Sequence, residues 1–241
     1  MRRADAGGVE VTATWWEREP VGLPGAWHRL DVRDRQALAE AARGVEAIVH
    51  TAYRQTGPDA WSTNVGGSEA VAAAAGGRRL VHLSSDLVFD GVRGRYREDD
   101  SPAPVHDYGR SKAEAERSVA ELHPEATIVR TSLIYGGPEP GTQERLAREG
   151  TRFFVDEIRS PVRVGDLADA ILELLELDVP GPLHLGGADD VSRYDFALLL
   201  GADPARIEQA HTTPDRAPNV SLDSSRAARL LQTSLRGVYD S

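Results

Sequence analysis

A tyrosine and a lysine four residues apart, Tyr108 and Lys112, have the spacing that most directly suggests chemistry in this chain. Of its 28 lysine and arginine residues, only Lys112 is a lysine. Residues at i and i+4 share one face of a helix, and an ammonium there could lower the pKa of a phenol from about 10. We therefore predict that Tyr108 is a general acid or base activated by Lys112. The alternative is that the spacing arose by chance and Tyr108 is a surface aromatic.

Hydroxyl groups end the apolar run at residues 80–85, which has the composition of a buried strand. Ligands of open α/β sheets bind at the carboxyl ends of strands, so Ser85 is expected at a functional site. Beside Tyr108, its hydroxyl could bind a substrate carbonyl or alkoxide. The alternative is that Ser84 and Ser85 cap the turn that follows.

Apolar runs alternate with helical patterns through the first part of the chain. Strands are expected at residues 9–16, 47–52, 80–85 and 127–131, and helices at residues 34–42, 59–75 and 107–122. This alternation predicts parallel βαβ units, and hence an α/β fold with a doubly wound, Rossmann-type parallel sheet.

The pattern loosens after a Gly/Pro-rich break at residues 136–141. We expect strands at 152–158 and 182–185, and helices at 164–177 and after Ser192. Leu167, Ile171, Leu174 and Leu175 form an apolar stripe that predicts core. We accordingly divide the chain into a dinucleotide-binding domain, residues 1–135, and a smaller α/β substrate lobe, residues 136–241, interleaved with it.

The composition excludes several classes of function. The net charge of −10 argues against nucleic-acid binding. The absence of cysteine excludes disulfides, thiolate zinc sites and a cysteine nucleophile, and we expect no metal site. No stretch approaches the roughly 20 apolar residues that span a bilayer, and the first eight residues lack a signal peptide's apolar run. We expect a cytoplasmic protein with neither nucleic acid nor membrane as a partner.

The middle of the chain resembles the extended short-chain dehydrogenase/reductases, and within them the dTDP-4-dehydrorhamnose reductase or RmlD-like branch. The resemblance runs from about Val9 to Arg229. It implies that Ser85, Tyr108 and Lys112 form a catalytic triad. Tyr108 would then donate a proton to the sugar C4 oxygen while nicotinamide delivers hydride to carbon, and Lys112 would also hold the nicotinamide ribose. The residues that carry the resemblance are 80–91, Tyr96, Glu98, Pro104, 108–112, 130–132 and 135–136.

The same resemblance implies further binding residues. Asn64 matches an asparagine that braces the active-site strand. Residues 28–34 resemble the segment in which the family's Asp-apolar pair meets adenine, and a helix N-cap is the alternative role for Asp31 and Asp34. Arg159 and Arg163 either face a nucleotide diphosphate or are surface arginines. The implied cofactor-binding residues are Arg18, Asp31, Val32, Thr51, Ala52, Tyr53, Lys112 and Thr131. The implied substrate-binding residues are Ser85, Asp86, Phe89, Tyr108, Leu133 and Arg159.

The chain departs from the family at its start. Family members begin with a strand and a glycine-rich loop that holds the pyrophosphate; here residues 1–8 resemble the end of the helix after that loop. A missing central strand would leave two apolar sheet edges unpaired. We expect that the natural chain starts further upstream. The alternative is that the protein does not hold a dinucleotide in the usual way.

Two other departures concern specificity. Leu133 stands where the family often has a tryptophan near the sugar, so the sequence does not specify which sugar is bound. Arg18 would suit a 2′-phosphate, so NADP(H) is expected rather than NAD(H), with Glu17 facing the ribose as the competing interpretation.

The expected function is NADPH-dependent reduction of a nucleotide-activated 4-keto sugar. One alternative is a sugar-nucleotide 4-epimerase using the same triad with bound NAD. Another is a non-catalytic RmlD-like sugar-nucleotide-binding or regulatory protein. A dehydratase is disfavoured because Asp86 is followed by Leu87, where that chemistry usually needs a second carboxylate. Members of the superfamily often form dimers through paired helices, so a homodimer is one possible oligomeric state of this protein.

Overall fold

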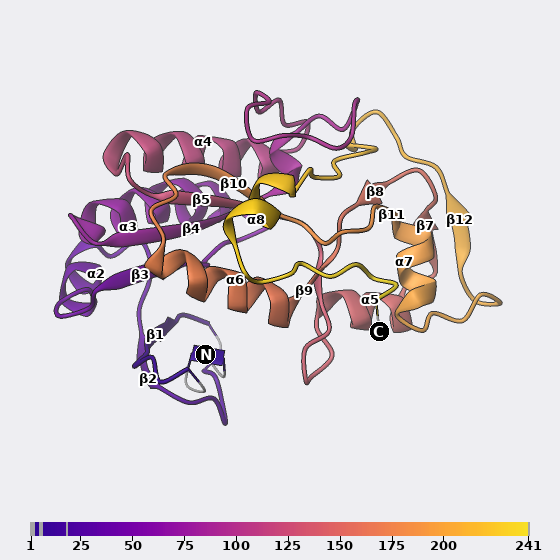
Figure 1. Ribbon diagram of the computed structural model, residues 1–241. Helices are drawn as coiled ribbons and strands as arrows, with labels where there is room; N and C mark the ends of the chain where they lie inside the picture. Colours follow the sequence, from indigo (N-terminus) through magenta and orange to yellow (C-terminus); the bar gives the residue numbers. More distant parts are fainter. Residues whose placement is uncertain (1–2, 5–6, 18, 241) are drawn as a thin grey trace.

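The computed structural model describes residues 3–4, 7–17 and 19–240. A parallel four-stranded sheet in the order β10-β5-β4-β3 forms its centre (Figure 1). The strands are β3 (Ala47–His50), β4 (Arg79–Ser85), β5 (Thr127–Thr131) and β10 (Gly181–Leu185). The expected doubly wound α/β fold is therefore confirmed.

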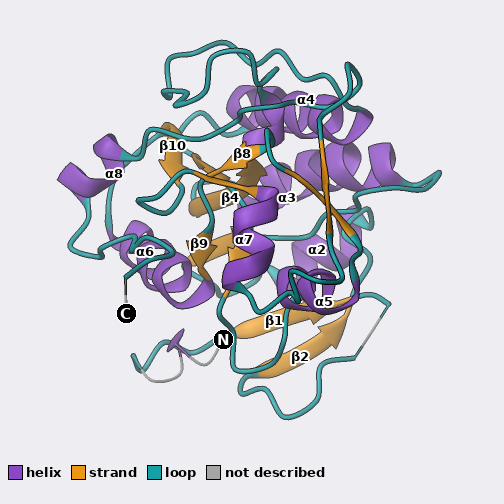
Figure 2. Ribbon diagram, turned by 90° about the vertical axis from the view of Figure 1, so that its right-hand side faces the viewer, coloured by secondary structure: helices purple, strands orange, loops and turns teal. Residues whose placement is uncertain are grey.

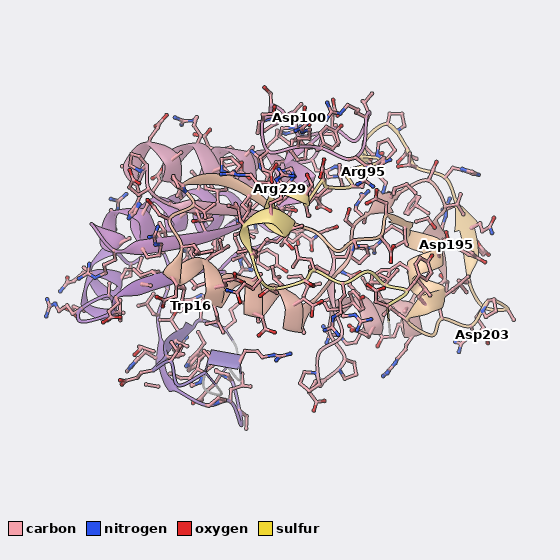
Figure 3. All side chains as sticks on the ribbon, viewed as in Figure 1. Trp16, Arg95, Asp100, Asp195, Asp203 and Arg229 are labelled. Atoms are coloured by element: carbon pink, nitrogen blue, oxygen red, sulfur yellow. The ribbon has the colours of Figure 1, made fainter. Side chains whose placement is uncertain are left out.

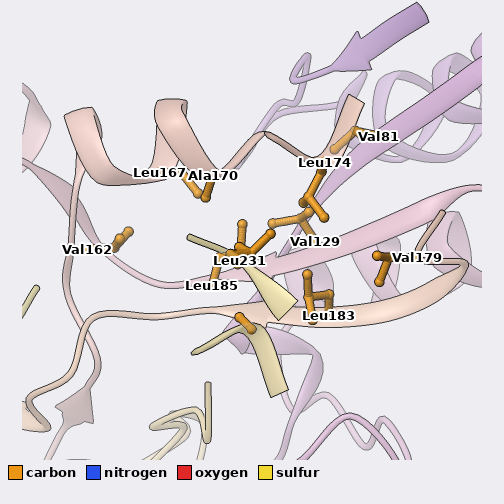
Figure 4. Packing of buried hydrophobic residues seen from close by; sticks show 11 residues of the cluster. Val81, Val129, Val162, Leu167, Ala170, Leu174, Val179, Leu183, Leu185 and Leu231 are labelled. Atoms are coloured by element: carbon orange, nitrogen blue, oxygen red, sulfur yellow. The ribbon is translucent and has the colours of Figure 1, made fainter. Parts of the chain in front are cut away.

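Alternate residues of the central strands face opposite layers of helices, because side chains on a strand point in turn to each face. Leu80 and Ile128 pack against α3 (Gly67–Ala75) and α4 (Asp107–Leu122). Val81 and Val129 pack on the other side, against α6 (Val164–Glu176) and α8 (Ser225–Leu230) (Figure 4). Within the expected stripe of α6, Leu167 and Leu174 are buried, and Ile171 and Leu175 are partly buried against the same cluster.

Strands β1 (Thr12–Trp15) and β2 (Ala26–Arg29) form a separate parallel pair (Figure 2). In the part of the chain that the structure describes, neither pairs with β3, so β3 has a free edge on which Val49 is 37% exposed. The expectation of unpaired edges is thereby confirmed. Helix α2 (Arg35–Ala41) connects the two sheets, and Asp34 caps it by accepting from the N–H groups of Gln36 and Ala37.

The second half of the chain contributes β10, α6 and α8 to the central layers and builds a smaller region of short strands. The strand expected at 152–158 is instead two strands, because the buried Glu157 lies in the turn between them and pairs with Arg216. Helices α5 (Thr142–Glu149) and α7 (Arg193–Leu199) pack beside these strands. The short strands are β6 (Ile134–Tyr135), β7 (Arg152–Phe154), β8 (Ile158–Arg159), β9 (Val162–Arg163), β11 (Val191–Ser192) and β12 (Glu208–Ala210).

Among the described residues, no helix combines the length and the apolar character that a membrane span requires.

Candidate active site

Helix α4 carries both Tyr108 and Lys112, one turn apart, and packs on β4. Lys112 is 2% exposed, and its ammonium donates a hydrogen bond of 2.7 Å to the backbone carbonyl of Leu83. Tyr108 is half-buried. The helix therefore places the phenol near the carboxyl end of β4 and anchors the lysine beneath it.

Ser85 ends β4 and is buried at this same edge. Its hydroxyl accepts from the N–H of Leu87 and donates to the carboxylate of Asp86. The hydroxyl of Ser85 also lies near enough to the phenol of Tyr108 to oppose, in part, the net rise of the Tyr108 pKa. Ser85 thus caps the short turn Asp86–Val88 and also lies beside the tyrosine, so both interpretations of this serine hold.

The electrostatics of Tyr108 differ from the expectation. Burial raises the pKa of Tyr108 above its ordinary value, and the charges of Tyr53 and Asp86 raise it further. Lys112 does not produce the expected lowering, because its ammonium is directed at the carbonyl of Leu83. Burial also lowers the pKa of Lys112 to about 8. The structure therefore contains a phenol that is protonated at neutral pH.

A buried ion pair lies one turn beyond Lys112. Glu116 accepts three hydrogen bonds of 2.8–3.1 Å from the guanidinium of Arg130 on β5, and both side chains are at most 6% exposed. The carboxylate also favours the charged form of Lys112 and raises its pKa against the effect of burial. Glu116 was not among the predicted site residues, although its i+4 spacing from Lys112 was the available signal.

Asn64 connects the loop after β3 to helix α4. It is fully buried in the π-helical turn η1 (Ser62–Gly66). Its amide donates to the hydroxyl of Ser111 at 2.8 Å, and Ser111 donates to the carbonyl of Tyr108 at 2.8 Å. The same amide accepts a hydrogen bond from the backbone N–H of Arg54 and donates one to the backbone carbonyl of Arg54. Asn64 therefore braces the loop after β3 and helix α4, whereas the resemblance implied that it braces the active-site strand.

Two histidines on adjacent strands lie beneath the site. His50 and His82 are register partners with ring centroids 5.1 Å apart. Burial lowers the pKa of His50 to about 3 and the pKa of His82 well below its ordinary value, and the charge of Lys112 lowers both further. Both rings are therefore neutral.

The expected cofactor residues lie along the carboxyl ends of β2, β3 and β5. Asp31 and Val32 follow β2; Asp31 accepts hydrogen bonds from Arg33 and does not cap α2. Thr51, Ala52 and Tyr53 are exposed after β3, where the ring centroid of Tyr53 is 5.9 Å from that of Tyr108. This exposed backbone beside the candidate acid fits a dinucleotide lying along the sheet edge. Thr131 instead donates its hydroxyl to the carbonyl of Leu185, and Arg18 lies outside the described residues.

Three of the expected substrate residues, Asp86, Leu133 and Phe89, differ in how far they are buried. Asp86 is buried at the site, accepts from Ser132 at 2.6 Å, and has its pKa raised by burial. Leu133 is half-buried after β5. The prediction that Phe89 binds substrate is wrong. Its side chain is 0% exposed and stacks on Tyr96 with ring centroids 4.2 Å apart, so it belongs to the core and cannot touch a substrate.

Arg159 was expected either to face a diphosphate or to lie on the surface, and the second alternative is wrong because it is 5% exposed. Its guanidinium donates to the carbonyls of Ile158, Ala217 and Pro218. Arg163, half-buried, donates to the hydroxyl of Tyr135 at 3.3 Å.

Two arginines contact the buried carboxylate of Glu157, and a third, Arg193, lies near them and donates to the amide oxygen of Gln143. Arg216 donates to the Glu157 carboxylate, and Arg159 lies 3.6 Å from it. Burial lowers the pKa of Arg193, and the positive charges of Arg159 and Arg216 lower it further. The charge of Arg159 also acts on Asp86. The arrangement concentrates positive charge beside the candidate catalytic residues; the sequence offered no signal for it, because the three arginines come from separate segments.

This fold, with the candidate residues at the carboxyl edge of a parallel sheet, is the fold of the short-chain dehydrogenase/reductases. The model of the RmlD substrate binding domain matches residues 2–238, and the chain belongs to this family.

Several named relatives support the assignment. A probable low-salt glycan biosynthesis reductase, Agl14, of Haloferax volcanii is 30% identical over 84% of this chain and 76% of its own length. A dTDP-4-dehydrorhamnose reductase of Mycolicibacterium smegmatis is 36% identical over 70% of this chain and 58% of its own length. The methionine adenosyltransferase 2 subunit beta of Bos taurus is 31% identical over 72% and 59%, respectively. The chain thus matches less than two thirds of the length of some of these relatives.

Solved structures have the same fold. The crystal structure of a hypothetical dTDP-4-dehydrorhamnose reductase from Sulfolobus tokodaii superimposes with a TM-score of 0.82 at 28% identity, covering 97% of this chain and 90% of that one. A Bacillus anthracis dTDP-4-dehydrorhamnose reductase in complex with NADP superimposes with a TM-score of 0.77, covering 95% and 96%. At 22% identity, the second comparison supports the fold alone.

Proposed function

We propose that this protein is an NAD(P)H-dependent reductase of a nucleotide-activated 4-keto sugar. The observation that carries the proposal is the convergence of Tyr108, Ser85 and Lys112 at the carboxyl end of β4. The relatives named as dTDP-4-dehydrorhamnose reductases support the class of substrate.

The chain's own residues have distinct roles in this reaction. A nicotinamide cofactor, when bound along this edge of the sheet, would supply a hydride to the C4 carbon of the sugar. Tyr108 donates its phenolic proton to the C4 oxygen, which converts the ketone to an alcohol. Ser85 holds that oxygen by a hydrogen bond, and Lys112 anchors helix α4, and with it Tyr108, to the strand that ends in Ser85.

The protonated state of Tyr108 suits the role of acid in a reductase. A reductase needs the tyrosine protonated when the ketone binds, and burial keeps the phenol in that form.

The arginines around Glu157 support an anionic substrate. Arg193 and Arg216 bring guanidinium groups to the substrate side of the site, and planar guanidinium groups bind phosphates by paired hydrogen bonds. We propose that they bind the diphosphate of the nucleotide sugar.

The experiment is a cofactor titration followed by a turnover assay. Binding of NADPH and NADH is measured by fluorescence, on this chain and on one extended upstream. Oxidation of the bound dinucleotide is then followed spectroscopically with a dTDP-4-keto-6-deoxy sugar. We expect stoichiometric oxidation of the cofactor with reduction of the sugar; failure of both forms to bind either dinucleotide contradicts the proposal.

A non-catalytic regulatory role is the second candidate, and the relative that is a methionine adenosyltransferase subunit favours it. The two functions differ in turnover. A regulatory subunit would bind dinucleotide without oxidising it, and Tyr108→Phe would leave every measured property of that subunit unchanged.

A further inference from the structure

His106 is the residue directly before helix α4, two positions before Tyr108. Its side chain is half-buried and makes no capping hydrogen bond to the helix. Instead, the ring nitrogen Nδ1 lies 3.0 Å from the backbone carbonyl oxygen of Asp215. A carbonyl oxygen only accepts, so Nδ1 carries the proton of the neutral ring and Nε2 carries the lone pair. Nε2 can therefore bind a ligand while the bond to Asp215 is kept.

That carbonyl belongs to residues 211–218, which follow β12 and run from the smaller region to the start of α4 (Figure 1). Asp195 in α7 and Asp100 in the loop before α4 mark the two parts that this segment joins (Figure 3). The next residue of the segment, Arg216, donates to the carboxylate of Glu157 from both Nε and Nη2. The histidine is therefore held beside the arginines that we propose bind the diphosphate.

Charged groups from several elements act on the ring of His106. Burial lowers the pKa of His106, and the charges of three arginines lower it further, whereas the charge of Glu157 raises it. The ring is therefore neutral at neutral pH when no ligand is bound. The charged groups near it are Asp107 and Arg110 on α4, Glu157 in the turn between β7 and β8, Arg159 on β8, and Asp215 and Arg216 in residues 211–218.

Binding of a nucleoside diphosphate sugar would reverse this balance of charge. Each of its two phosphates carries one negative charge and would pair with the guanidinium groups beside the ring. An opposite charge within about 6 Å favours the charged form of a histidine. The protonated ring then has a second donor, Nε2–H, for a phosphate oxygen, while Nδ1–H still donates to Asp215.

We propose that His106 is a substrate-binding residue that contacts the diphosphate of the nucleotide sugar through Nε2 and takes up a proton from solvent when the sugar binds. The inference rests on the proposed function, because it needs a diphosphate beside Arg193 and Arg216. It adds a binding group that is not an arginine. Since His106 begins the helix that carries Tyr108, it also connects the charged part of the substrate to the position of the acid.

The test uses dTDP-glucose, a nucleoside diphosphate sugar without the keto group, so that binding is measured without turnover. Each of its phosphates is esterified on two sides, so its charge stays constant between pH 5.5 and pH 7.5, unlike that of a phosphate monoester. Isothermal titration calorimetry, with NADP+ present at a fixed concentration, gives the dissociation constant. Repeating it in two buffers of different ionisation enthalpy gives the number of protons taken up.

A group that gains a proton on binding makes the ligand bind more tightly as the pH falls. For the wild type we expect binding that is about fivefold tighter at pH 5.5 than at pH 7.5, with uptake of about half a proton at pH 6. His211→Gln is the matched control, because His211 lies in the same segment and its side chain is 80% exposed. It should keep both the pH dependence and the proton uptake.

Two variants separate the roles of the two ring nitrogens, and neither new side chain titrates. His106→Asn keeps an N–H donor near the position of Nδ1, whereas His106→Gln places its N–H near the position of Nε2. His106→Asn should bind dTDP-glucose with the wild-type affinity of pH 7.5 throughout the range, changing by less than about twofold and taking up no proton. If the histidine only held Asp215 in place, His106→Asn would keep the wild-type pH dependence and only His106→Gln would weaken binding.

Circular dichroism checks that both variants are folded. Wild-type proton uptake in His106→Asn overturns the inference alone, as does a wild type that binds dTDP-glucose equally well at both pH values. A wild type that does not bind dTDP-glucose at either pH overturns the proposed function together with it.

Discussion

The ammonium of Lys112 lies 2.7 Å from the carbonyl oxygen of Leu83, two residues before Ser85 on β4. This hydrogen bond fastens helix α4 to the strand that ends in Ser85. Since the same helix carries Tyr108, the bond fixes the phenol relative to the serine hydroxyl. The lysine therefore has a positioning role that the spacing in the sequence did not reveal.

Replacing the phenol should separate chemistry from binding. Tyr108→Phe removes one hydroxyl, and we expect turnover to fall by roughly 10²–10⁴-fold, the usual contribution of a general acid. The dissociation constant of the dinucleotide should stay within about twofold, because the ring is retained. Steady-state kinetics and fluorescence titration measure the two effects. Tyr239→Phe, at a tyrosine that is 66% exposed, is the control. Full activity in Tyr108→Phe would reject this residue as the acid.

The charge of Lys112 should not be sufficient for its role. Lys112→Arg keeps a positive charge, but the larger planar group cannot occupy a site that is 2% exposed and still donate to Leu83 in the same way. We expect at least a roughly 100-fold loss of kcat, measured by cofactor oxidation. The reciprocal change Arg117→Lys, on an exposed part of the same helix, should have no effect. Wild-type rates in Lys112→Arg would contradict the argument from the single lysine.

The pair of Glu116 and Arg130 should be costly to break from one side. Glu116→Gln leaves the buried guanidinium without its counter-ion, and we expect a loss of about 3–5 kcal/mol in the free energy of unfolding. Glu114→Gln breaks an exposed pair with Arg117 on the same helix and should cost at most about 1 kcal/mol. Urea denaturation compares the two variants. Equal losses would show that the pair of Glu116 and Arg130 is not desolvated as described.

Buried neutral histidines should make the fold acid-sensitive. The pKa of His50 is lowered to about 3 and that of His184 to about 4, and His82 is lowered well below its ordinary value. Below pH about 6.5 the unfolded chain binds protons that the folded chain does not, so stability falls as the pH falls. Each histidine contributes about 1.4 kcal/mol per pH unit, down to its folded pKa.

This acid sensitivity is measured by urea denaturation between pH 7.5 and pH 5. His82→Leu should remove about 1.4 kcal/mol per pH unit from the slope below pH about 6.5, because both ring nitrogens of His82 are buried and have no hydrogen-bond partner within the described residues. His211→Gln, at a side chain that is 80% exposed, is the matched control. A slope that is the same in the wild type and in His82→Leu would contradict the neutral, buried state of this ring.

Local patterns predicted the elements that are defined by their own residues. Strand β5 and helix α4 have the expected bounds, because periodic apolar residues and flanking polar ones specify them locally. The proximity of Tyr108 and Lys112 followed from helix geometry for the same reason. The resemblance to the RmlD-like family extended this to the fold as a whole.

The tertiary structure decided what depends on residues far apart in the sequence. The burial of Phe89 against Tyr96, the pairing of Glu116 with Arg130 and the ion pair of Arg54 with Glu17 join separate segments. The pKa of Tyr108 depends on how much solvent the surrounding chain excludes, which a spacing of four residues does not specify. The sequence alone determined which groups could react, whereas packing determined their charge, their partners and their access to a ligand.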